Sequence, residues 1–435
     1  MRWGCARDGD DIVNILFAPA HYLLDGVSGG SEYGWAYGII NTLSTQSDLR
    51  LFVVTGMVRS DKRLPANVTL IRLGGSPTLK FSSSYRLAFV GRYYLAAQRI
   101  LHQHRIDVIH HIGPFGYGTT FNLLPLLGAT RRIPFVIGPL QVPHTMQGGE
   151  EQTFSQEDVR SGPTASDAAR EQLSAALIRA GRPILHGLST RTLRDSDYLV
   201  AVNKQARDLY ASVTPNIPAV VIPPGVDTNR FGQVSALDRD RGNRDGDSGV
   251  DILYVGWLFV RKGLDLVIAA MARLVPRYPS LRLHIIGDGP QRGALEVLVA
   301  RSNLGPNVIF EGVVENAALA TRYAHADIFV SMSYSESFGQ TLIEGMISGL
   351  PVVSARNMGS NEIIEDGETG YLVEPGNVAM LVERLDTLIS RPDLRVSLGQ
   401  RARDVVRRRY NWTTIGEQYH DVYREAVRRR ARVMR

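Results

Sequence analysis

Residues 328–354, IFVSMSYSESFGQTLIEGMISGLPVVS, contain a strand, a polar turn and a helix in succession. The apolar run Ile328–Ser331 predicts a buried strand, and the helical pattern begins near Gly339. Gly349 and Pro351 together form a usual stop signal for a helix. Because a strand followed directly by a helix is the repeating unit of a parallel sheet covered by helices, this stretch predicts an α/β fold.

The same alternation of short apolar strands and amphipathic helices runs through the rest of the chain. In the first half the predicted strands are Ile12–Ala18, Leu51–Val54, Val68–Leu73, Asp107–His110, Phe135–Gly138 and Tyr198–Val202. In the second half they are Ile252–Gly256, Leu281–Gly287, Val308–Phe310 and Ile328–Ser331. The predicted helices between them include Tyr85–His104, Gly263–Arg277, Arg292–Arg301 and Ala317–Ala324. The pattern predicts two doubly wound, Rossmann-like domains with mostly parallel sheets.

A break in this alternation predicts the domain boundary. Residues 220–231 read VVIPPGVDTNRF, in which two prolines and a glycine interrupt regular structure, and the polar residues 235–249 predict an exposed loop. We expect an N-terminal domain over 1–225, a C-terminal domain over 226–410 and a basic helix over 411–435 that crosses back to the N-terminal domain. A cleft is expected between the domains. The polar stretch Thr145–Ala169 is either a mobile loop beside that cleft or a disordered insertion.

The bulk composition is that of an ordinary globular protein. A chain of 435 residues suits two domains of about 200 residues each. Cys5 is the single cysteine, which excludes an internal disulfide, and the polar start MRWGCARDGDD predicts no secretion signal. The longest apolar runs reach about half of the ~20 residues that a membrane span needs. We therefore expect a cytoplasmic protein.

The net charge of +6 is concentrated at the end of the chain. Residues 401–435 contain eleven arginines and four acidic residues. Apolar residues recur there at helical spacing, at Ile415, Tyr419, Val422, Tyr423 and Ala426. A surface helix with a solvated basic face is one interpretation, and peripheral contact with the anionic inner face of a membrane is the other. We expect no nucleic-acid partner.

Two glutamates bracket the predicted helix start at Gly339. Glu336 precedes the helix, and Glu344 lies one turn or more inside it. The free N–H groups and the dipole of a helix start favour an anionic ligand, and a glycine there allows close approach of the backbone. Since ionised carboxylates are strong acceptors for sugar hydroxyls, the layout fits a ligand with a sugar, a diphosphate and a second sugar. The alternative is a helix start with ordinary acidic residues.

A pair of cations occupies a second turn. Arg261 and Lys262 follow the predicted strand Ile252–Gly256 and precede Gly263 and a helix. Ligands of such folds bind at the carboxyl ends of the strands, so this pair is placed to neutralise a diphosphate leaving group. The alternative is a pair of solvated loop cations. No metal site is predicted, because the Asp-rich stretches lie in polar loops and no zinc spacing or Walker loop is present.

These motifs together resemble the retaining GT-B glycosyltransferases of glycosyltransferase family 4, the glycosyl transferases group 1. ESFGQTLIE is similar to that family's motif of two glutamates separated by seven residues, and VRKG resembles its basic donor-phosphate motif. LHIIGDGP, ADIFVSMSYSESFG and GSNEIIEDGETGYLVEPGN resemble neighbouring segments of the same domain. VIPPGVDTNRF looks like the hinge strand, and GVSGGSEYGWAYGI looks like the N-terminal glycine loop. The match is dense in the C-terminal half and limited to layout in the N-terminal half.

The resemblance implies a set of site residues. Glu344 would bind the nucleotide ribose hydroxyls, and Glu336 would hold hydroxyls of the donor sugar near the anomeric carbon. Arg261 and Lys262 would stabilise the departing diphosphate. Backbone groups for sugar and phosphate would come from Phe338, Gly339, Gln340 and Thr341. Gly29 and Gly30 would let the N-terminal loop approach phosphate or acceptor. No metal or cofactor would be needed beyond the UDP- or GDP-sugar itself, because cationic side chains and the helix start replace the metal.

Two departures from the family pattern concern the site. The family usually has an arginine directly after the strand glycine, where this chain has Trp257, so Arg261 is expected to substitute. Many relatives have a histidine where this chain has Gly138-Pro139. His111 is our candidate for that catalytic role, with His110 and His144 as further candidates; a structural role is the alternative for a histidine at a strand end.

The predicted activity is metal-independent retaining transfer of a sugar from a nucleotide-sugar to a hydroxyl acceptor. Two alternatives share the fold: a nucleotide-sugar epimerase, and a degenerate homologue that binds nucleotide-sugar without turnover. The spacing of Arg261, Lys262, Glu336 and Glu344 favours the transferase.

Overall fold

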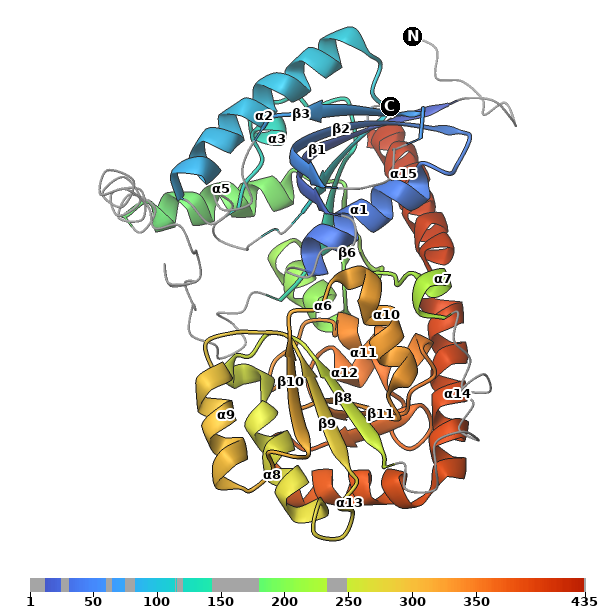
Figure 1. Ribbon diagram of the computed structural model, residues 1–435. Helices are drawn as coiled ribbons and strands as arrows, with labels where there is room; N and C mark the ends of the chain where they lie inside the picture. Colours follow the sequence, from blue (N-terminus) through green and yellow to red (C-terminus); the bar gives the residue numbers. More distant parts are fainter. Residues whose placement is uncertain are drawn as a thin grey trace. The chain divides into compact units, whose positions relative to one another are not determined.

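The structure of this chain is a computed structural model that describes residues 12–24, 31–59, 65–74, 83–113, 115, 120–142, 180–232 and 249–433. These residues form two compact units, each built on one parallel sheet (Figure 1). The first unit contains 12–24, Glu32–Ile222 and the end of the chain from Gly416, and the second contains Pro223–Ile415. The chain therefore leaves the first unit after Ile222 and returns to it at Gly416.

The first unit has a parallel sheet with the strand order β3-β2-β1-β4-β5-β6-β7. The strands are β1 (Val13–Leu24), β2 (Leu49–Arg59), β3 (Val68–Arg72), β4 (Val108–Ile112), β5 (Phe135–Leu140), β6 (Tyr198–Ala201) and β7 (Ala219–Val221). The helices are α1 (Ser31–Leu43), α2 (Ser83–Gln103), α3 (Leu123–Leu126), α5 (Arg182–Arg194), α6 (Lys204–Val213) and α15 (Trp412–Val433). The central strands are apolar and buried on both faces, as a parallel sheet covered by helices requires, and Leu16, Phe52 and Phe135 lie in their core.

The second unit has the strand order β10-β9-β8-β11-β12-β13, again parallel throughout. Its strands are β8 (Asp251–Val255), β9 (Arg282–Ile286), β10 (Val308–Gly312), β11 (Ile328–Ser331), β12 (Val352–Ala355) and β13 (Gly370–Val373). Its helices are α7 (Thr228–Phe231), a 3-10 turn at Val260–Lys262, α8 (Leu264–Leu274), α9 (Arg292–Arg301), α10 (Asn316–His325), α11 (Gln340–Ile347), α12 (Ser360–Ile363), α13 (Val378–Ser390) and α14 (Pro392–Arg409). Val267, Leu283 and Leu385 belong to its buried core.

Both sheets confirm the doubly wound α/β fold predicted from the sequence. The strand predicted at Ile328–Ser331 is β11, and the helix predicted after Gly339 is α11. The sequence analysis did not identify β7, β12 and β13. Each has three or four residues, and a run this short carries little periodic signal, although β6 and β11, with four residues each, were predicted. The predicted loop at Thr145–Ala169 and residues 235–248 of the predicted loop 235–249 lie outside the described residues.

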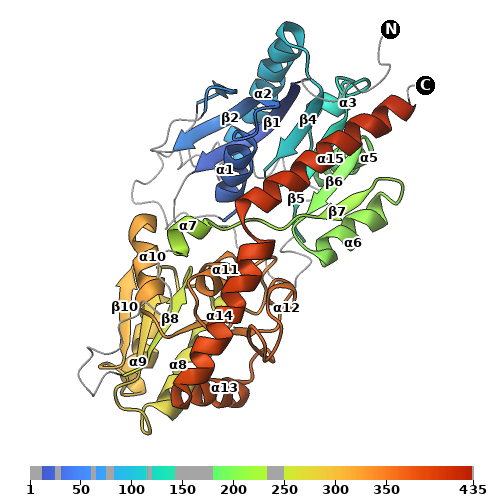
Figure 2. The ribbon, with the colours of Figure 1, turned by 90° about the vertical axis from the view of Figure 1, so that its right-hand side faces the viewer.

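The C-terminal helix α15 packs mainly on the first unit (Figure 2). The residues predicted at helical spacing, Ile415, Tyr419, Val422, Tyr423 and Ala426, are all buried. Arg430 anchors the far end of the helix through an ion pair of 2.6 Å with Asp197. In the described part of the chain, no helix combines the length and the apolar character needed to cross a bilayer.

His110 links α15 to the sheet through both of its ring nitrogens. Burial lowers the pKa of His110 to about 3, so the imidazole is neutral. Its Nε2 lies 3.1 Å from the Gly138 carbonyl oxygen and therefore carries the proton, which leaves Nδ1 to accept from the Tyr423 hydroxyl at 2.8 Å. A neutral histidine that is fully engaged in this way has a structural role in the first unit.

Candidate functional site

The candidate site lies at the point of the second sheet where the strand order reverses. From β8 the chain continues to β9 and β10 on one side of the sheet, and it then crosses to β11 on the other side of β8. Helices leaving β8 and β11 in opposite directions open a crevice at the carboxyl ends of these two strands, where such folds bind ligands. The turns after β8 and β11 contain Arg261, Lys262 and Glu336.

The turn with the two cations packs directly against the end of β11. Val260–Lys262 form a single 3-10 turn that ends at Gly263, whose φ is 62°. A Cβ at Gly263 would lie 2.3 Å from the Met332 carbonyl oxygen, so only glycine fits both the backbone conformation and the space. The Arg261 carbonyl also accepts from the Tyr334 N–H at 2.9 Å. The two turns therefore form one unit, which fixes the cations relative to Glu336.

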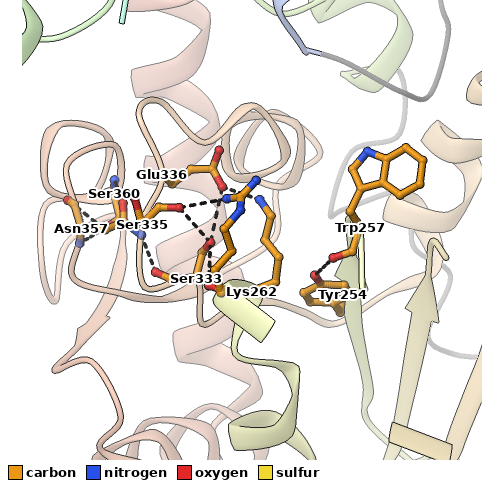
Figure 3. A network of polar contacts seen from close by, with 9 residues as sticks. Tyr254, Trp257, Lys262, Ser333, Ser335, Glu336, Asn357 and Ser360 are labelled. Atoms are coloured by element: carbon orange, nitrogen blue, oxygen red, sulfur yellow. Dashed lines mark hydrogen bonds and ion pairs between the residues drawn. The ribbon is translucent and has the colours of Figure 1, made fainter. Parts of the chain in front are cut away.

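A polar network joins the two turns (Figure 3). Lys262 Nζ lies 2.5 Å from Glu336 Oε2, and the Arg261 guanidinium donates to the Ser335 carbonyl at 3.2 Å. The Ser333 hydroxyl lies within 3.3–3.4 Å of the Arg261 carbonyl, the Ser335 carbonyl and Glu336 Oε2, and it can donate to one of them at a time. The side chains of Lys262 and Glu336 keep 17% and 27% of their surface exposed, so an incoming ligand can reach the pair.

The loop after β12 supports the Glu336 turn from the other side. Asn357 Nδ2 donates to the Ser333 carbonyl at 2.8 Å, and the Gly359 N–H donates to the Glu336 carbonyl at 2.9 Å. A Cβ at Gly359 would lie 2.1 Å from the Phe338 carbonyl oxygen. The sequence analysis missed the residues of this support, Ser333, Ser335 and Asn357. Their one sequence signal is that each follows a short apolar run, β11 for the two serines and β12 for Asn357.

The start of α11 has the geometry predicted from the sequence. Gly339 is the N-terminal cap with φ of 97°, and a Cβ there would approach Leu342 Cδ1 to 2.9 Å. No side chain caps the N–H groups of the first turn, which leaves the helix start suited to an anion. Phe338 is buried before the cap, and the Gln340 amide donates to the Gly225 carbonyl at 3.2 Å. Thr341 follows Gln340 in this first turn.

Glu344 lies further along α11, in a different environment from Glu336. Its Oε2 accepts from the Tyr323 hydroxyl at 3.0 Å. Burial raises the pKa of the Glu344 carboxyl to about 7, although Tyr323, the charge of Arg230 and the Gln340 side chain act in the opposite direction. The two glutamates of the motif are therefore distinct: Glu336 is paired with a cation, and Glu344 is a half-buried acid whose pKa is raised to about 7.

Trp257 stands at the carboxyl end of β8, where the family pattern has arginine. Its indole is 43% exposed, and its ring centroid lies 6.1 Å from that of Phe259. The Trp257 carbonyl accepts from the buried Tyr254 hydroxyl at 3.0 Å. Burial is the main cause of the raised pKa of Tyr254; the charge of Glu336 raises that pKa further and the charge of Arg261 lowers it. Tyr254 is therefore close enough to interact electrostatically with both site residues. Since Trp257 carries no charge, Arg261 and Lys262 supply the cations of the turn after β8.

The remaining candidate that the structure describes, His111, lies in the first unit. His111 is fully buried on β4, its Nδ1 lies 3.2 Å from Asn122 Nδ2, and its ring packs edge-on against Phe115 at 5.4 Å. Its catalytic role stays a prediction. Gly29, Gly30 and His144 lie outside the described residues. Among the described residues, no group of three or more His, Cys, Asp and Glu side chains could hold a metal ion.

The fold and the site define the class of the protein, an α/β protein of GT-B type with two Rossmann-like units. Comparison with family models supports a narrower assignment. Residues 45–230 match the model described as Glycosyltransferase Family 4, and residues 238–405 match that of Glycosyl transferases group 1. The chain belongs to the family 4 glycosyltransferases.

Solved structures and curated proteins resemble the chain to different extents. Sucrose-phosphate synthase from Thermosynechococcus elongatus has a TM-score of 0.65 at 21% identity and covers 95% of this chain and 98% of its own. HepE of Anabaena in complex with UDP has a TM-score of 0.62 at 19% identity, with 95% and 100% covered. These similarities concern the fold.

Among curated proteins, sulfoquinovosyl transferase SQD2 of Arabidopsis thaliana is 37% identical over 164 residues, which is 37% of this chain and 30% of that protein. The GDP-mannose-dependent alpha-(1-6)-phosphatidylinositol monomannoside mannosyltransferase of Mycolicibacterium smegmatis is 28% identical over 245 residues, with 54% and 64% covered. The chain spans less than two thirds of the length of these curated relatives.

Proposed function

We propose that this protein is a retaining glycosyltransferase that moves a sugar from a UDP- or GDP-sugar to a hydroxyl acceptor and requires no metal ion. One observation carries the proposal: Arg261 and Lys262 from the β8 turn meet Glu336 from the β11 turn at the strand-order reversal of the second sheet. Cations, a carboxylate and an uncapped helix start in one place match the charges of a nucleotide-sugar.

The donor fits this arrangement with one group for each of its parts. The diphosphate lies at the start of α11 and against Arg261 and Lys262, while Glu336 accepts from hydroxyls of the transferred sugar. Since a lysine ammonium has three N–H donors, Lys262 can keep its contact with Glu336 and still donate to phosphate. Glu344, deeper along α11, accepts from the ribose hydroxyls.

The reaction follows from these positions. The bond between the anomeric carbon and the phosphate oxygen breaks, and its electron pair stays on the diphosphate, where Arg261, Lys262 and the helix start stabilise the charge. The acceptor hydroxyl oxygen forms the new bond on the face that the phosphate leaves, and its proton passes to a departing phosphate oxygen. Configuration at the anomeric carbon is thereby retained.

The curated relatives support the reaction class without defining the substrates. Their names specify transfer of sulfoquinovose in one case and of mannose from GDP-mannose in another. Because these donors differ while the family is shared, we propose only the common chemistry, a nucleotide-sugar donor and a hydroxyl acceptor.

The test compares Lys262→Ala with a control variant, Arg273→Ala, which removes an exposed cation from α8. A thermal-shift screen of UDP- and GDP-sugars identifies the donor, because a ligand that binds the native state raises the melting temperature. NMR then follows the anomeric configuration of the sugar first released from that donor. We expect retention, and a loss of turnover of about a hundredfold in Lys262→Ala, the scale for removing one group that stabilises developing charge.

Three results would contradict the proposal. Binding of donors without any turnover would indicate a degenerate homologue. Release of an epimerised sugar in the absence of acceptor would favour the epimerase. Equal turnover in Lys262→Ala and Arg273→Ala would remove the role assigned to the cation turn.

A further inference from the structure

Helices α2, α3, α5 and α6 cover one face of the first sheet. The chain moves from β3 across the sheet to β4 and on to β5, β6 and β7, and right-handed crossovers place these helices on the same face. The short helix α3 contacts both α2 and α5 (Figure 1). The outward sides of these three helices therefore belong to one surface of the first unit.

This surface carries exposed arginines and almost no acidic side chains. No aspartate or glutamate occurs in α2, in residues 120–134 around α3, or in α5; the nearest is Asp195, which follows α5 and pairs with Arg191 at 3.3 Å. Every arginine of these segments whose side chain is described is exposed: Arg92, Arg99, Arg131, Arg132, Arg182, Arg191 and Arg194. We call this surface the arginine face.

Large apolar side chains project from the same surface. Leu95 on α2 and Leu127 at the end of α3 are each 61% exposed, and Ile184 on α5 is 70% exposed. Leu95 lies three residues after Arg92 and four before Arg99, so the three side chains share one stripe of α2. Apolar tips surrounded by cations are the pattern of a surface that enters the boundary between lipid headgroups and acyl chains.

The C-terminal helix, which the sequence offered as a membrane-binding segment, lacks this pattern. Tyr419, Val422, Tyr423 and Ala426 of α15 are buried in the first unit. Its exposed acidic residues, Glu417 and Asp421, lie in the first half of the helix, and its exposed arginines follow from Arg424 onward. Among the described residues of α15 no large apolar side chain is exposed, whereas the arginine face combines cations with apolar tips.

We propose that the arginine face binds the surface of an anionic lipid bilayer. Each arginine near such a surface favours binding by about fivefold, and the effect multiplies over helices α2, α3 and α5, which contain no acidic residue. Leu95, Leu127 and Ile184 add burial of apolar surface, which a polynucleotide could not offer to isolated aliphatic side chains. The inference goes beyond the proposed transferase activity and does not depend on it.

Vesicle sedimentation of the full-length protein tests the proposal. The vesicles contain phosphatidylcholine alone or phosphatidylcholine with phosphatidylglycerol, and each is used at low and at high salt. Arg92→Glu/Arg99→Glu reverses two charges of the arginine face. The matched control, Arg407→Glu/Arg408→Glu, makes the same change in net charge at exposed positions of α14.

We expect the wild type to bind only the vesicles with phosphatidylglycerol, and less at high salt. The arginine-face variant should bind them at least about tenfold more weakly, and the control should bind within about twofold of the wild type. A second variant, Leu95→Ser/Ile184→Ser, leaves the charge unchanged. It should also bind about tenfold more weakly than the wild type, since it loses two apolar anchors.

The outcomes that overturn the proposal are distinct. If the wild type does not bind the phosphatidylglycerol vesicles, the proposal that the arginine face binds an anionic bilayer is wrong. Equal losses in the two charge-reversal variants would indicate attraction by net charge alone. Unchanged binding of Leu95→Ser/Ile184→Ser together with tighter binding of the wild type to duplex DNA would assign the face to a polynucleotide. The melting temperature of each variant excludes unfolding as the cause of any loss.

Discussion

Donor binding should be linked to proton release from Glu344. The free protein holds this carboxyl largely protonated below about pH 7, because burial raises its pKa from 4.5 to about 7. A ribose hydroxyl that donates to the carboxyl oxygens stabilises the ionised form. Binding below pH 7 must therefore expel a proton, and donor affinity should rise with pH and level off above the pKa of Glu344.

The magnitude follows from the ionised fraction of Glu344. With a pKa of about 7, that fraction rises from about 0.09 at pH 6 to about 0.9 at pH 8. The dissociation constant for the donor should fall about tenfold over this range, equivalent to about 1.4 kcal/mol. The diphosphate of a nucleotide-sugar has no proton to lose in this range, so the donor itself does not titrate.

Glu344→Gln provides the matched control, because it keeps the shape of the side chain and removes the titration. Calorimetry at pH 6 and pH 8, in buffers with different ionisation enthalpies, measures both the affinity and the protons released. We expect Glu344→Gln to bind the donor with the same affinity at both pH values and about as weakly as the wild type at pH 6. Wild-type binding that does not vary with pH, or equal pH dependence in Glu344→Gln, would refute the assignment of Glu344 as the ribose ligand.

Two further predictions concern the second unit. Gly263→Ala should lower the free energy of unfolding by about 2–4 kcal/mol, because the new Cβ overlaps the Met332 carbonyl oxygen. The control Gly376→Ala, at a position with a similar positive φ and open space, should lower it by about 1 kcal/mol. Equal losses in urea unfolding would contradict the packing of the Gly263 turn against Met332. His284 has a raised pKa, caused first by its bond to Asp251 and then by Glu311, so its stabilising effect is complete below the ordinary histidine pKa of 6.5 and is lost as pH rises through the folded-state pKa. Thermal melts of His284→Gln should lack this decline in stability, and a decline as steep as that of the wild type would place its origin elsewhere.

The sequence was sufficient for the fold class and for the centre of the site because both depend on local patterns. The alternation of apolar strands and amphipathic helices requires parallel sheets, and Gly339 and Gly263 mark backbone conformations that other residues rarely adopt. Arg261, Lys262 and Glu336 were assigned to one site because each follows a strand, and the carboxyl ends of parallel strands share one edge.

The residues that support this centre could not be predicted in the same way. Ser333 and Asn357 have no distinctive spacing, and their contacts depend on how the β11 and β12 turns pack. His110 and His111 were alike as sequence candidates. The sheet and α15 together give His110 two hydrogen-bond partners that fix it as a neutral structural group.

The sequence by itself determined most of the order of strands and helices, the family and the charge of each motif, since these follow from residue type and spacing along the chain. The tertiary structure alone decided which charges meet and which are exposed. It paired Lys262 with Glu336 and placed Glu344 against the buried Tyr323. It also buried the apolar side of α15 and left Leu95 and Ile184 exposed among arginines. Distance and burial set electrostatic and hydrophobic energies, and neither can be read from the order of residues.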